Sequence, residues 1–229
     1  MKDIRPIRGK YYIRQLIEQG EHEHQDFKYA ISDARKIARS ISAFANNDGG
    51  RLLVGVKDNG SIVGIPNEED IYMIENAAER YCFPPAEIVI DAFKVENGAV
   101  VLRVDIHKAH ERPVYCLEEN NRKVAYIRVK DQNIAAHPIM VRGWEMSKGK
   151  SSFSCSAEER GILSWISENE PVNPDDMHLK LHISRERCDD ALSFFASMNL
   201  IGFVHTSHGF MIVIPKDEED GDDDINVFP

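Results

Sequence analysis

Apolar residues recur at helical spacing in two stretches near the start of the chain. The stretch 11–19 carries Tyr12 and Leu16 on one side and ends at Gly20, which suits a helix C-terminus. We expect Ser32 to cap the second helix, because its hydroxyl can accept a backbone N–H bond of the first turn. The periodic residues of this second helix are Ala34, Ile37, Ile41 and Phe44.

Apolar runs and alternations predict strands between and after these helices. Residues 51–56 form the continuous run of a buried strand, and an Asp-Asn-Gly turn after it predicts a second short strand. Residues 87–95 and 99–106 alternate around an Asn-Gly pair, which is a hairpin signal, and 124–129 is a further strand. A third helix is expected over 67–82. Helices and hairpins together predict an α/β (α+β) fold with helices packed on a mixed sheet.

A different pattern follows a polar, small-residue stretch. Residues 146–155 read as a linker, and 156–215 then give a helix, a helix-turn-helix and two strands, which is the winged-helix order. The chain is therefore predicted to consist of an α/β domain over 1–145, this linker, a winged-helix domain over 156–215, and an acidic disordered tail over 216–229.

The charge of the chain is concentrated in that tail. The 28 Lys and Arg and 38 Asp and Glu give a formal net charge of −10. Residues 216–229 hold seven of the acids and one Lys, so only −4 remains for the rest of the chain. Neither predicted domain is a basic body of the kind that binds phosphate backbones indiscriminately. Any nucleic-acid binding must depend on a local basic patch.

Compartment signals point to the cytoplasm. No apolar run approaches the roughly 20 residues that span a bilayer, and the basic start lacks the apolar middle of a secretory signal. We expect no membrane partner. The cysteines form no Cys-x-x-Cys pair, so reduced, buried thiols are favoured over a disulfide framework or zinc knuckle. They are Cys82, Cys116, Cys155 and Cys188.

Several motifs resemble one family. The segments GEHEHQDFK (20–28), ISAFANNDGGRLLVGVKDNGSIVGI (41–65), ERPVYC (111–116) and VAYIRVKDQ (124–132) occur in its order. Over about residues 15–143 the chain is similar to the Schlafen/AlbA-type domain, also described as a divergent AAA-related domain linked to DNA. The resemblance implies a compact α/β domain associated with nucleic acid. Animal members include metal-dependent endoribonucleases, and bacterial members are often fused to helix-turn-helix modules.

The resemblance also implies an acidic site. The nuclease carboxylates fall on Glu21, Asp26 and Asp58, with Lys28 as basic partner, although Asp26 stands where the family has Glu. Three converging carboxylates repel one another unless a cation joins them, and oxygen ligands suit Mg²⁺ or Mn²⁺. Such an ion would polarise a phosphodiester while Lys28 steadied the developing charge. The alternative is a solvated acidic rim without a metal.

Two further motifs are weaker signals. His22 and His24 share a strand face and could bind a softer metal, but an exposed polar face is the simpler interpretation. The Asn-Asn-Asp-Gly-Gly stretch 46–50 precedes a strand and lacks the Lys of a Walker loop. It is interpreted as a tight helix-to-strand turn that needs positive φ.

Basic residues supply the candidates for nucleic-acid contact. In the first domain they are Arg35, Lys36, Arg39, Arg51, Arg122, Lys123, Arg128 and Lys130. Tyr115 and Tyr126 could stack on bases. In the second domain Arg185 and Arg187 begin the presumed recognition helix, which also carries three acids. Ordinary surface charge and core tyrosines are the alternative throughout.

These observations predict a nucleic-acid-binding protein, acting on DNA or RNA, with a regulatory role in transcription or another nucleic-acid process. Binding requires no cofactor. Two alternatives remain open. One is a metal-dependent nuclease that uses Mg²⁺ or Mn²⁺, and the other is a protein-interaction scaffold. In the scaffold the winged helix would dock a partner or form a homodimer.

Overall fold

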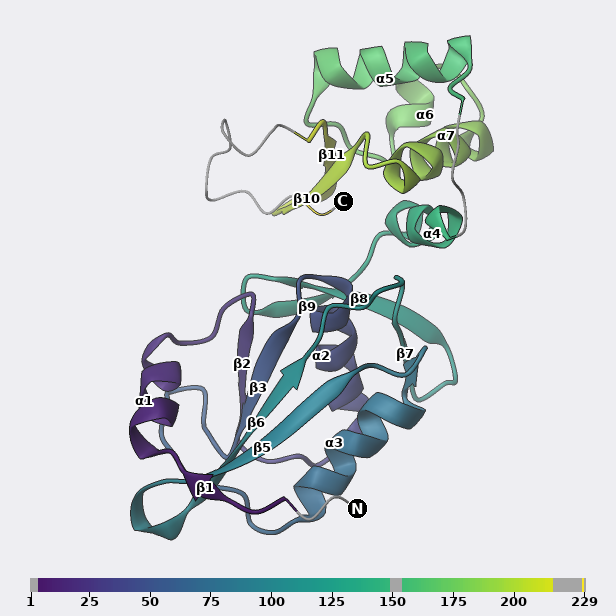
Figure 1. Cartoon of the computed structure of the whole chain (residues 1–229). Helices are drawn as coiled ribbons and strands as arrows, with labels where there is room; N and C mark the ends of the chain where they lie inside the picture. The colour runs from purple at the N-terminus through teal and green to yellow at the C-terminus, as the bar shows by residue number, and fades with distance from the viewer. Residues whose placement is uncertain (1–3, 149–153, 216–227, 229) are drawn as a thin grey trace. The chain divides into compact units, whose positions relative to one another are not determined.

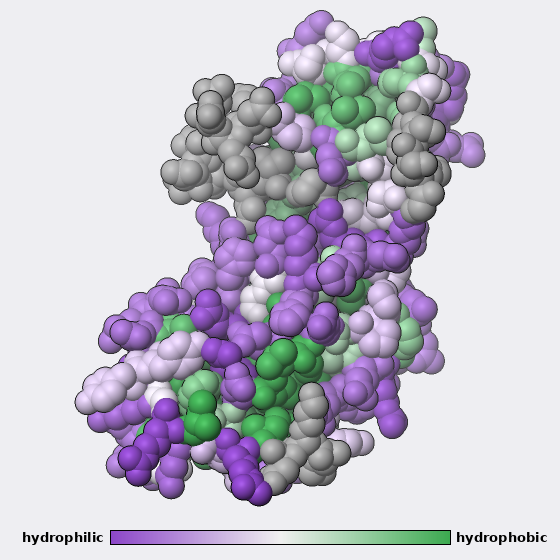
Figure 2. Space-filling view, viewed as in Figure 1, coloured by the Kyte–Doolittle hydropathy of each residue, from purple (hydrophilic) through white to green (hydrophobic). Residues whose placement is uncertain are grey.

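The computed structural model describes residues 4–148, 154–215 and 228. The chain divides into two compact units, Met1–Ala135 and Ala136–Pro229 (Figure 1). Within the described part no helix is both long and apolar enough to cross a membrane. The visible face of the first unit is mostly hydrophilic, with several smaller apolar patches between the polar side chains (Figure 2).

A mixed five-stranded sheet forms the centre of the first unit, as the sequence predicted. Its order is β1-β5-β6-β3-β2; the β1/β5 and β2/β3 pairs are parallel and the others antiparallel. The strands are β1 (Ile7–Arg8), β2 (Gln25–Lys28), β3 (Gly50–Val54), β5 (Ile88–Lys94) and β6 (Val100–Ile106). Asn97, at φ 53°, turns the chain between β5 and β6, which confirms that hairpin.

A second, antiparallel sheet follows the order β4-β7-β8-β9. It consists of β4 (Cys82–Phe83), β7 (Tyr115–Leu117), β8 (Lys123–Val129) and β9 (Gln132–Ala135). Only β8 was predicted. The turn after β3 does not produce the second strand expected from the sequence: the chain folds back with an isolated bridge between Val56 and Ile62 and a few backbone hydrogen bonds.

Three helices cover the five-stranded sheet: α1 (Lys10–Glu18), α2 (Ala34–Asn46) and α3 (Glu69–Arg80). Alternation along β3 places Leu52 in the core shared with α2 and α3, and Leu53 in the cluster that packs on α1. Helix α2 starts one residue later than predicted. Asp33, not Ser32, is its N-cap, because the extended backbone of Asp33 lets its carboxylate accept from Arg35 N at 2.9 Å.

The second unit contains α4 (Pro138–Ser147), α5 (Ala157–Asn169), α6 (Met177–Lys180), α7 (Arg185–Ser197) and the hairpin β10 (Gly202–Thr206) with β11 (Gly209–Val213). Helix α4 belongs here, so the division falls after residue 135 and not near 145 as expected. A Cβ on Gly143 would lie 2.7 Å from Ala196 Cβ, and this close approach to α7 fixes α4 in the second core.

The predicted linker and tail are only partly visible. Residues 146–147 of the predicted linker 146–155 are helical, whereas 149–153 lie outside the described residues. Of the predicted tail 216–229, Phe228 alone is described. Its N–H donates to Phe203 O and its carbonyl accepts from Phe203 N, both at 2.8 Å, so Phe228 pairs with β10.

Candidate nucleic-acid interface

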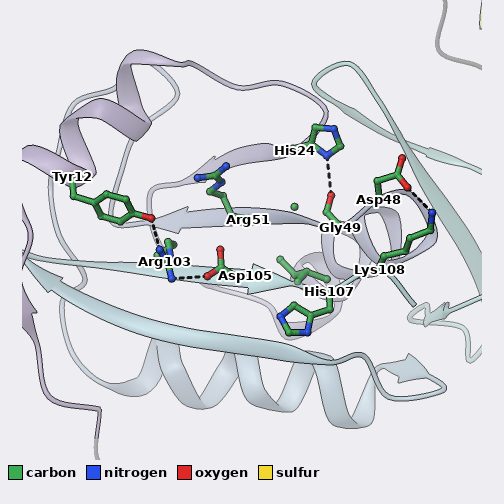
Figure 3. A pocket seen from close by; sticks show the side chains of 11 residues that line it. Tyr12, His24, Asp48, Gly49, Arg51, Arg103, Asp105, His107 and Lys108 are labelled. Carbon is green, nitrogen blue, oxygen red and sulfur yellow. Dashed lines mark hydrogen bonds and ion pairs between the residues drawn. The ribbon is translucent and has the colours of Figure 1, made fainter. Parts of the chain in front are cut away.

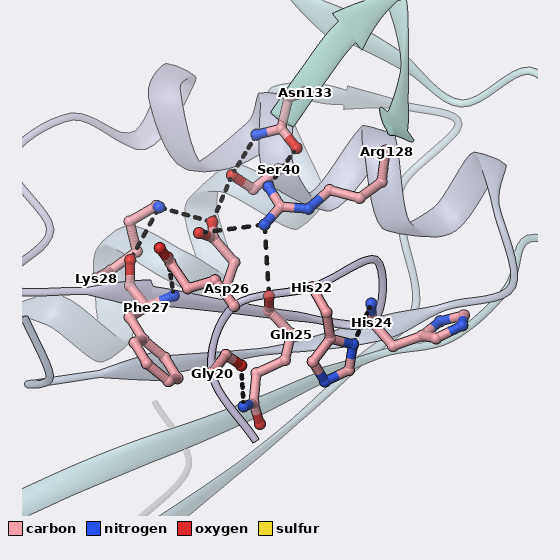
Figure 4. A network of polar contacts seen from close by, with 11 residues as sticks. Gly20, His22, His24, Gln25, Asp26, Phe27, Lys28, Ser40, Arg128 and Asn133 are labelled. Carbon is pink, nitrogen blue, oxygen red and sulfur yellow. Dashed lines mark hydrogen bonds and ion pairs between the residues drawn. The ribbon is translucent and has the colours of Figure 1, made fainter. Parts of the chain in front are cut away.

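Asp26 of β2 lies at the centre of a buried polar network (Figure 4). Its carboxylate contacts Lys28 Nζ at 2.6 Å and Arg128 Nη2 at 3.5 Å. Ser40 of α2 donates to the same carboxylate at 3.5 Å. Two cations therefore already neutralise the residue that the family resemblance assigned to a metal.

Arg128 itself is an interior residue, with a side chain only 1% exposed. It donates to Asn133 Oδ1 at 3.0 Å and to Gln25 O at 3.4 Å, and its guanidinium lies over the Phe44 ring at 5.2 Å. The prediction that Arg128 contacts nucleic acid is wrong on this geometry. A guanidinium placed in the core beside a carboxylate stabilises the fold and is not available to a phosphate.

Glu21 is the second carboxylate of this region. Its Oε1 accepts a hydrogen bond from Phe27 N at 2.9 Å. Burial, and next the neighbouring Asp26, raise the pKa of Glu21, as expected when a carboxyl loses water and gains a like-charged neighbour. Glu21 and Asp26 are thus brought together, as the resemblance implied.

Asp58 does not complete the predicted three-carboxylate group. It lies in an exposed turn after β3, where Gly60 N donates to Lys57 O at 2.8 Å. Across the described ranges, no three His, Cys, Asp or Glu side chains are placed to hold a metal ion. The sequence motif puts Asp58 near the strand end, but Asp58 is exposed there, whereas Asp26 is buried.

An open pocket of about 540 Å³ lies near the start of β3 and the end of β6 (Figure 3). The β3/β6 register places Arg51 opposite Asp105 and Gly50 opposite Ile106, so basic and acidic groups meet in its wall. The pocket is lined by Tyr12, His24, Asp48, Gly49, Gly50, Arg51, Arg103, Asp105, Ile106, His107 and Lys108.

The cations of this pocket differ in how they are held. Arg103 contacts Asp91 and Asp105, each at 2.8 Å, and also Tyr12 OH. Lys108 pairs with Asp48 at 2.6 Å. Arg51, half-buried, makes no ion pair with any described residue and points into the pocket (Figure 3). Of the predicted nucleic-acid contacts, Arg51 is the one that lines this cavity.

Cations outnumber carboxylates in the lining of the pocket, which contains Arg51, Arg103 and Lys108 against Asp48 and Asp105. Desolvation lowers the pKa of His22, and the neighbouring His24 and Arg51 lower it further, because nearby positive charge opposes protonation. The hydrogen bond from Lys108 holds the pKa of Asp48 below its usual value. His24 Nδ1 lies 3.1 Å from Gly49 O, which directs the other edge of the ring away from the turn. An anion is the ligand that this arrangement favours.

The Asn-Asn-Asp-Gly-Gly motif builds one wall of the pocket. Asn46 exchanges hydrogen bonds with Val114 at 2.7 and 2.9 Å, and Asn47 donates to Arg128 O at 2.8 Å, so both amides fasten the second sheet to α2. Gly49 has φ 79°, and a Cβ there would lie 2.8 Å from Ile106 O. The structure confirms the tight-turn interpretation at Gly49.

The basic residues on α2 are mostly engaged. Arg39 Nε donates to Glu118 at 2.8 Å, and Tyr126 OH donates to the same carboxylate at 2.6 Å. Arg35 lies over the Tyr81 ring at 5.4 Å. Glu118 therefore engages both side chains, although the Arg39 side chain is still 40% exposed.

The remaining predicted contacts lie on the surface. Four predicted contacts of the first unit are exposed, and Tyr115 is partly exposed. The four are Lys36, Arg122, Lys123 and Lys130. In the second unit Arg185 donates to Asp175 O at 2.8 Å, and Arg187 contacts Glu158 at 2.5 Å. Acids therefore accompany both arginines of the presumed recognition helix.

Sequence reasoning missed much of the pocket, including His107, Lys108, Arg103 and Asp105. They lie on or just after β6, and only its antiparallel register with β3 brings them to Arg51. The alternation of apolar and polar residues along 99–106 predicted a strand there, but it did not indicate that this strand pairs with β3.

Comparison with known proteins gives a family and two similar folds. Residues 21–137, more than half of the chain, match the family model described as Schlafen, AlbA_2. No curated protein matches. The DIP2311 protein from Corynebacterium diphtheriae is 18% identical with a TM-score of 0.43, over 82% of this chain and 34% of that one. The chain thus spans about a third of that protein's length.

The second structure is the N-terminal domain of a protein from Nitrosomonas europaea that is described as an ATP-dependent DNA helicase RecG-related protein. It is 19% identical with a TM-score of 0.39, and the similarity covers 66% of this chain and 95% of that domain.

Proposed function

This chain belongs to the Schlafen AlbA_2 family, and on that premise we propose that it binds nucleic acid through the pocket around Arg51 and acts as a regulator of a nucleic-acid process. The observation that carries the proposal is an arginine, unpaired among the described residues, in a positive, solvent-open pocket. Of the other predicted arginines, Arg39, Arg185 and Arg187 pair with acids, Arg128 is buried, Arg35 lies over the Tyr81 ring, and Arg122 is exposed outside the pocket. Phosphate contacts by Lys and Arg supply most sequence-independent affinity, so such a cation is the natural anchor.

Two neighbours strengthen the anchor. Lys108 shares its ammonium with Asp48, which leaves donors available to a second oxygen, and His24 presents a ring edge beside Arg51. The pocket holds about 540 Å³, enough for a phosphate with its sugar. We propose that it takes one such group of the nucleic-acid backbone, and the titration below distinguishes single strands from a duplex.

The test is a binding titration of the full chain with single- and double-stranded DNA and RNA at two salt concentrations. Arg51→Gln is expected to weaken binding by about five- to tenfold and to lower the slope of log K against log salt by roughly 0.7 for single strands. The matched control is Arg80→Gln, an exposed arginine at the end of α3, which should change neither quantity. Equal affinity of the Arg51 variant and the wild type would refute the pocket as the binding site.

The second unit is proposed to be a winged helix with a docking role. The order of its helices and hairpin supports this proposal. A second observation is Val172, in the segment between α5 and α6, which forms a β-bridge with Ile212 of β11 and adds a third strand position to the hairpin. Because Arg185 and Arg187 are paired with acids, protein docking or homodimer formation is favoured over DNA binding for this unit. Docking of a partner by the second unit is therefore also the proposal that remains of the protein-interaction scaffold.

The nuclease alternative keeps one supporting observation, the adjacency of Glu21 and Asp26. Its weakness is that Lys28 and Arg128 already neutralise Asp26, and that Asp58 stands apart. Mg²⁺ or Mn²⁺ chemistry would require Asp26 to exchange these cations for a metal.

A further inference from the structure

Two cysteines face each other across the edge of the second sheet. Cys82 of β4 is the register partner of Cys116 of β7. Leu117 N donates to Tyr81 O at 2.9 Å, so the hydrogen bonds flank the cysteine pair and leave it as a non-hydrogen-bonded pair. At such a position opposite Cα atoms lie about 4.5 Å apart, within the range that a disulfide spans.

Their side chains point to the same side of this sheet. Both are fully buried in the core that contains α2. Cys82 Sγ donates to Ala38 O at 3.7 Å, and Cys116 Sγ donates to Arg35 O at 3.6 Å. These two carbonyls lie three residues apart on α2, about one turn, so the thiols lie side by side against one stretch of helix.

We propose that Cys82 and Cys116 form a modification site, at which a low-molecular-weight disulfide such as glutathione disulfide oxidises the pair to an intramolecular disulfide. One thiolate attacks the glutathione disulfide, forms a mixed disulfide and releases one glutathione thiolate. The second cysteine then attacks the mixed disulfide and releases the other glutathione. The protein loses two electrons and two protons, and the glutathione disulfide gains them as two thiols.

The resting state of the pair is reduced and slow to react. Burial raises the pKa of Cys116 to about 12 and that of Cys82 as well, so thiolate is scarce in the closed structure. The site must open to react, and its position allows this. β4 has only two residues and is the edge strand of its sheet, so opening it breaks its pairing with β7 and its packing on α2 and α3 but no pairing with any other strand. The inference does not depend on the pocket around Arg51.

The experiment incubates the full chain, carrying Cys155→Ser, with excess glutathione disulfide without denaturant. We expect a mass loss of about 2 Da, a peptide linking Cys82 to Cys116, and a melting temperature higher by roughly 5–10 °C that a dithiol reverses. Additional Cys82→Ser or Cys116→Ser substitutions should abolish all three changes.

Two results would overturn the proposal. One is a chain that keeps both thiols, or carries only glutathione adducts, after incubations longer than the opening time measured by amide exchange. The other comes from oxidising the unfolded chain first. If the Cys82–Cys116 disulfide then gives a refolded protein with a lower melting temperature than the reduced one, the native geometry does not accept the bond.

Discussion

The Asp26 network and the Arg51 pocket draw on the same β2–β3 pair and on the same residue types, yet they treat charge in opposite ways. In the network, Asp26 and Arg128 are both nearly fully buried, and Lys28 adds a second cation. In the pocket, Arg51 remains without an ion-pair partner among the described residues and faces solvent. One region is closed by internal pairing, and the other is left open to an external anion.

The difference shows how a catalytic-looking motif can serve the fold. A buried carboxylate must be paired or protonated, because leaving it charged and alone costs several kcal/mol. Asp26 meets that demand with Lys28 and with an arginine from a strand far along the chain. A ligand-binding cation shows the opposite signature, since exposure removes the demand for an internal partner.

The sharpest test of this contrast compares Arg128→Met with Arg51→Met. Arg128→Met is expected to lower the free energy of unfolding by about 3–5 kcal/mol, because it leaves Asp26 buried with Lys28 alone. Arg51→Met should change it by less than about 0.5 kcal/mol. Urea unfolding of the full chain, followed by circular dichroism and analysed for the first unit, measures both.

A second substitution controls for lost packing. Arg128→Met combined with Asp26→Leu removes both charges and should recover a large part of the loss, since no unpaired buried charge remains. If Arg128→Met alone is as mild as Arg51→Met, the network does not stabilise the fold and the contrast fails.

The fold could be predicted from the sequence further than the site could. Long elements carry a period, so 34–44, 87–95 and 99–106 were predicted as one helix and two strands. β4 has two residues and β7 three, which is too short for any alternation to show. Residues 138–145 were assigned to the first domain without a predicted helix, because nothing local in their sequence indicates that they pack on α7.

The site depends on pairings that sequence order hides. Arg128 looked like a surface cation, and only its burial and its contact with Asp26 show that it belongs to the fold. Arg51 was one of ten basic residues chosen as candidates, and the sequence offered no way to rank them. Whether a cation has a carboxylate partner depends on residues that are close in space but distant in sequence, so the sequence alone does not reveal it.

A smaller effect is expected from the pH dependence of Glu21. The pKa of Glu21 is higher in the folded protein than its unfolded value of 4.5. Ionisation of Glu21 therefore lowers the free energy of unfolding as the pH rises from 4.5 through the pKa of the folded protein. Glu21→Gln keeps an oxygen for Phe27 N and should stabilise the protein at pH 7 by less than about 1 kcal/mol, given solvent screening. The gain should vanish below pH 4.5.

Urea midpoints of the two proteins at pH 4 and pH 7 measure this difference. Glu18→Gln, an exposed position on α1, is the matched control and should show no pH-dependent gain. A Glu21 variant that is less stable than the wild type at pH 7 would mean that the ionised carboxylate is favourable, and would revive a cation-binding role for it.

The smallest expected effect is also the most decisive for the nuclease alternative. Glu21→Gln with Asp58→Asn preserves shape and removes two charges from the predicted acidic site. Because Asp58 stands apart and Asp26 is already paired, we expect no Mn²⁺-dependent cleavage of RNA or DNA by the wild type, and hence none for the variant to lose. Binding should be unchanged or up to about threefold tighter, because repulsion of phosphate falls.

A nuclease would behave differently: the wild type would cut with Mn²⁺, and the double variant would bind without cutting. Robust cleavage lost in the double variant would show that Asp26 releases its cations for a metal, and that the two regions are not as different as their geometry indicates.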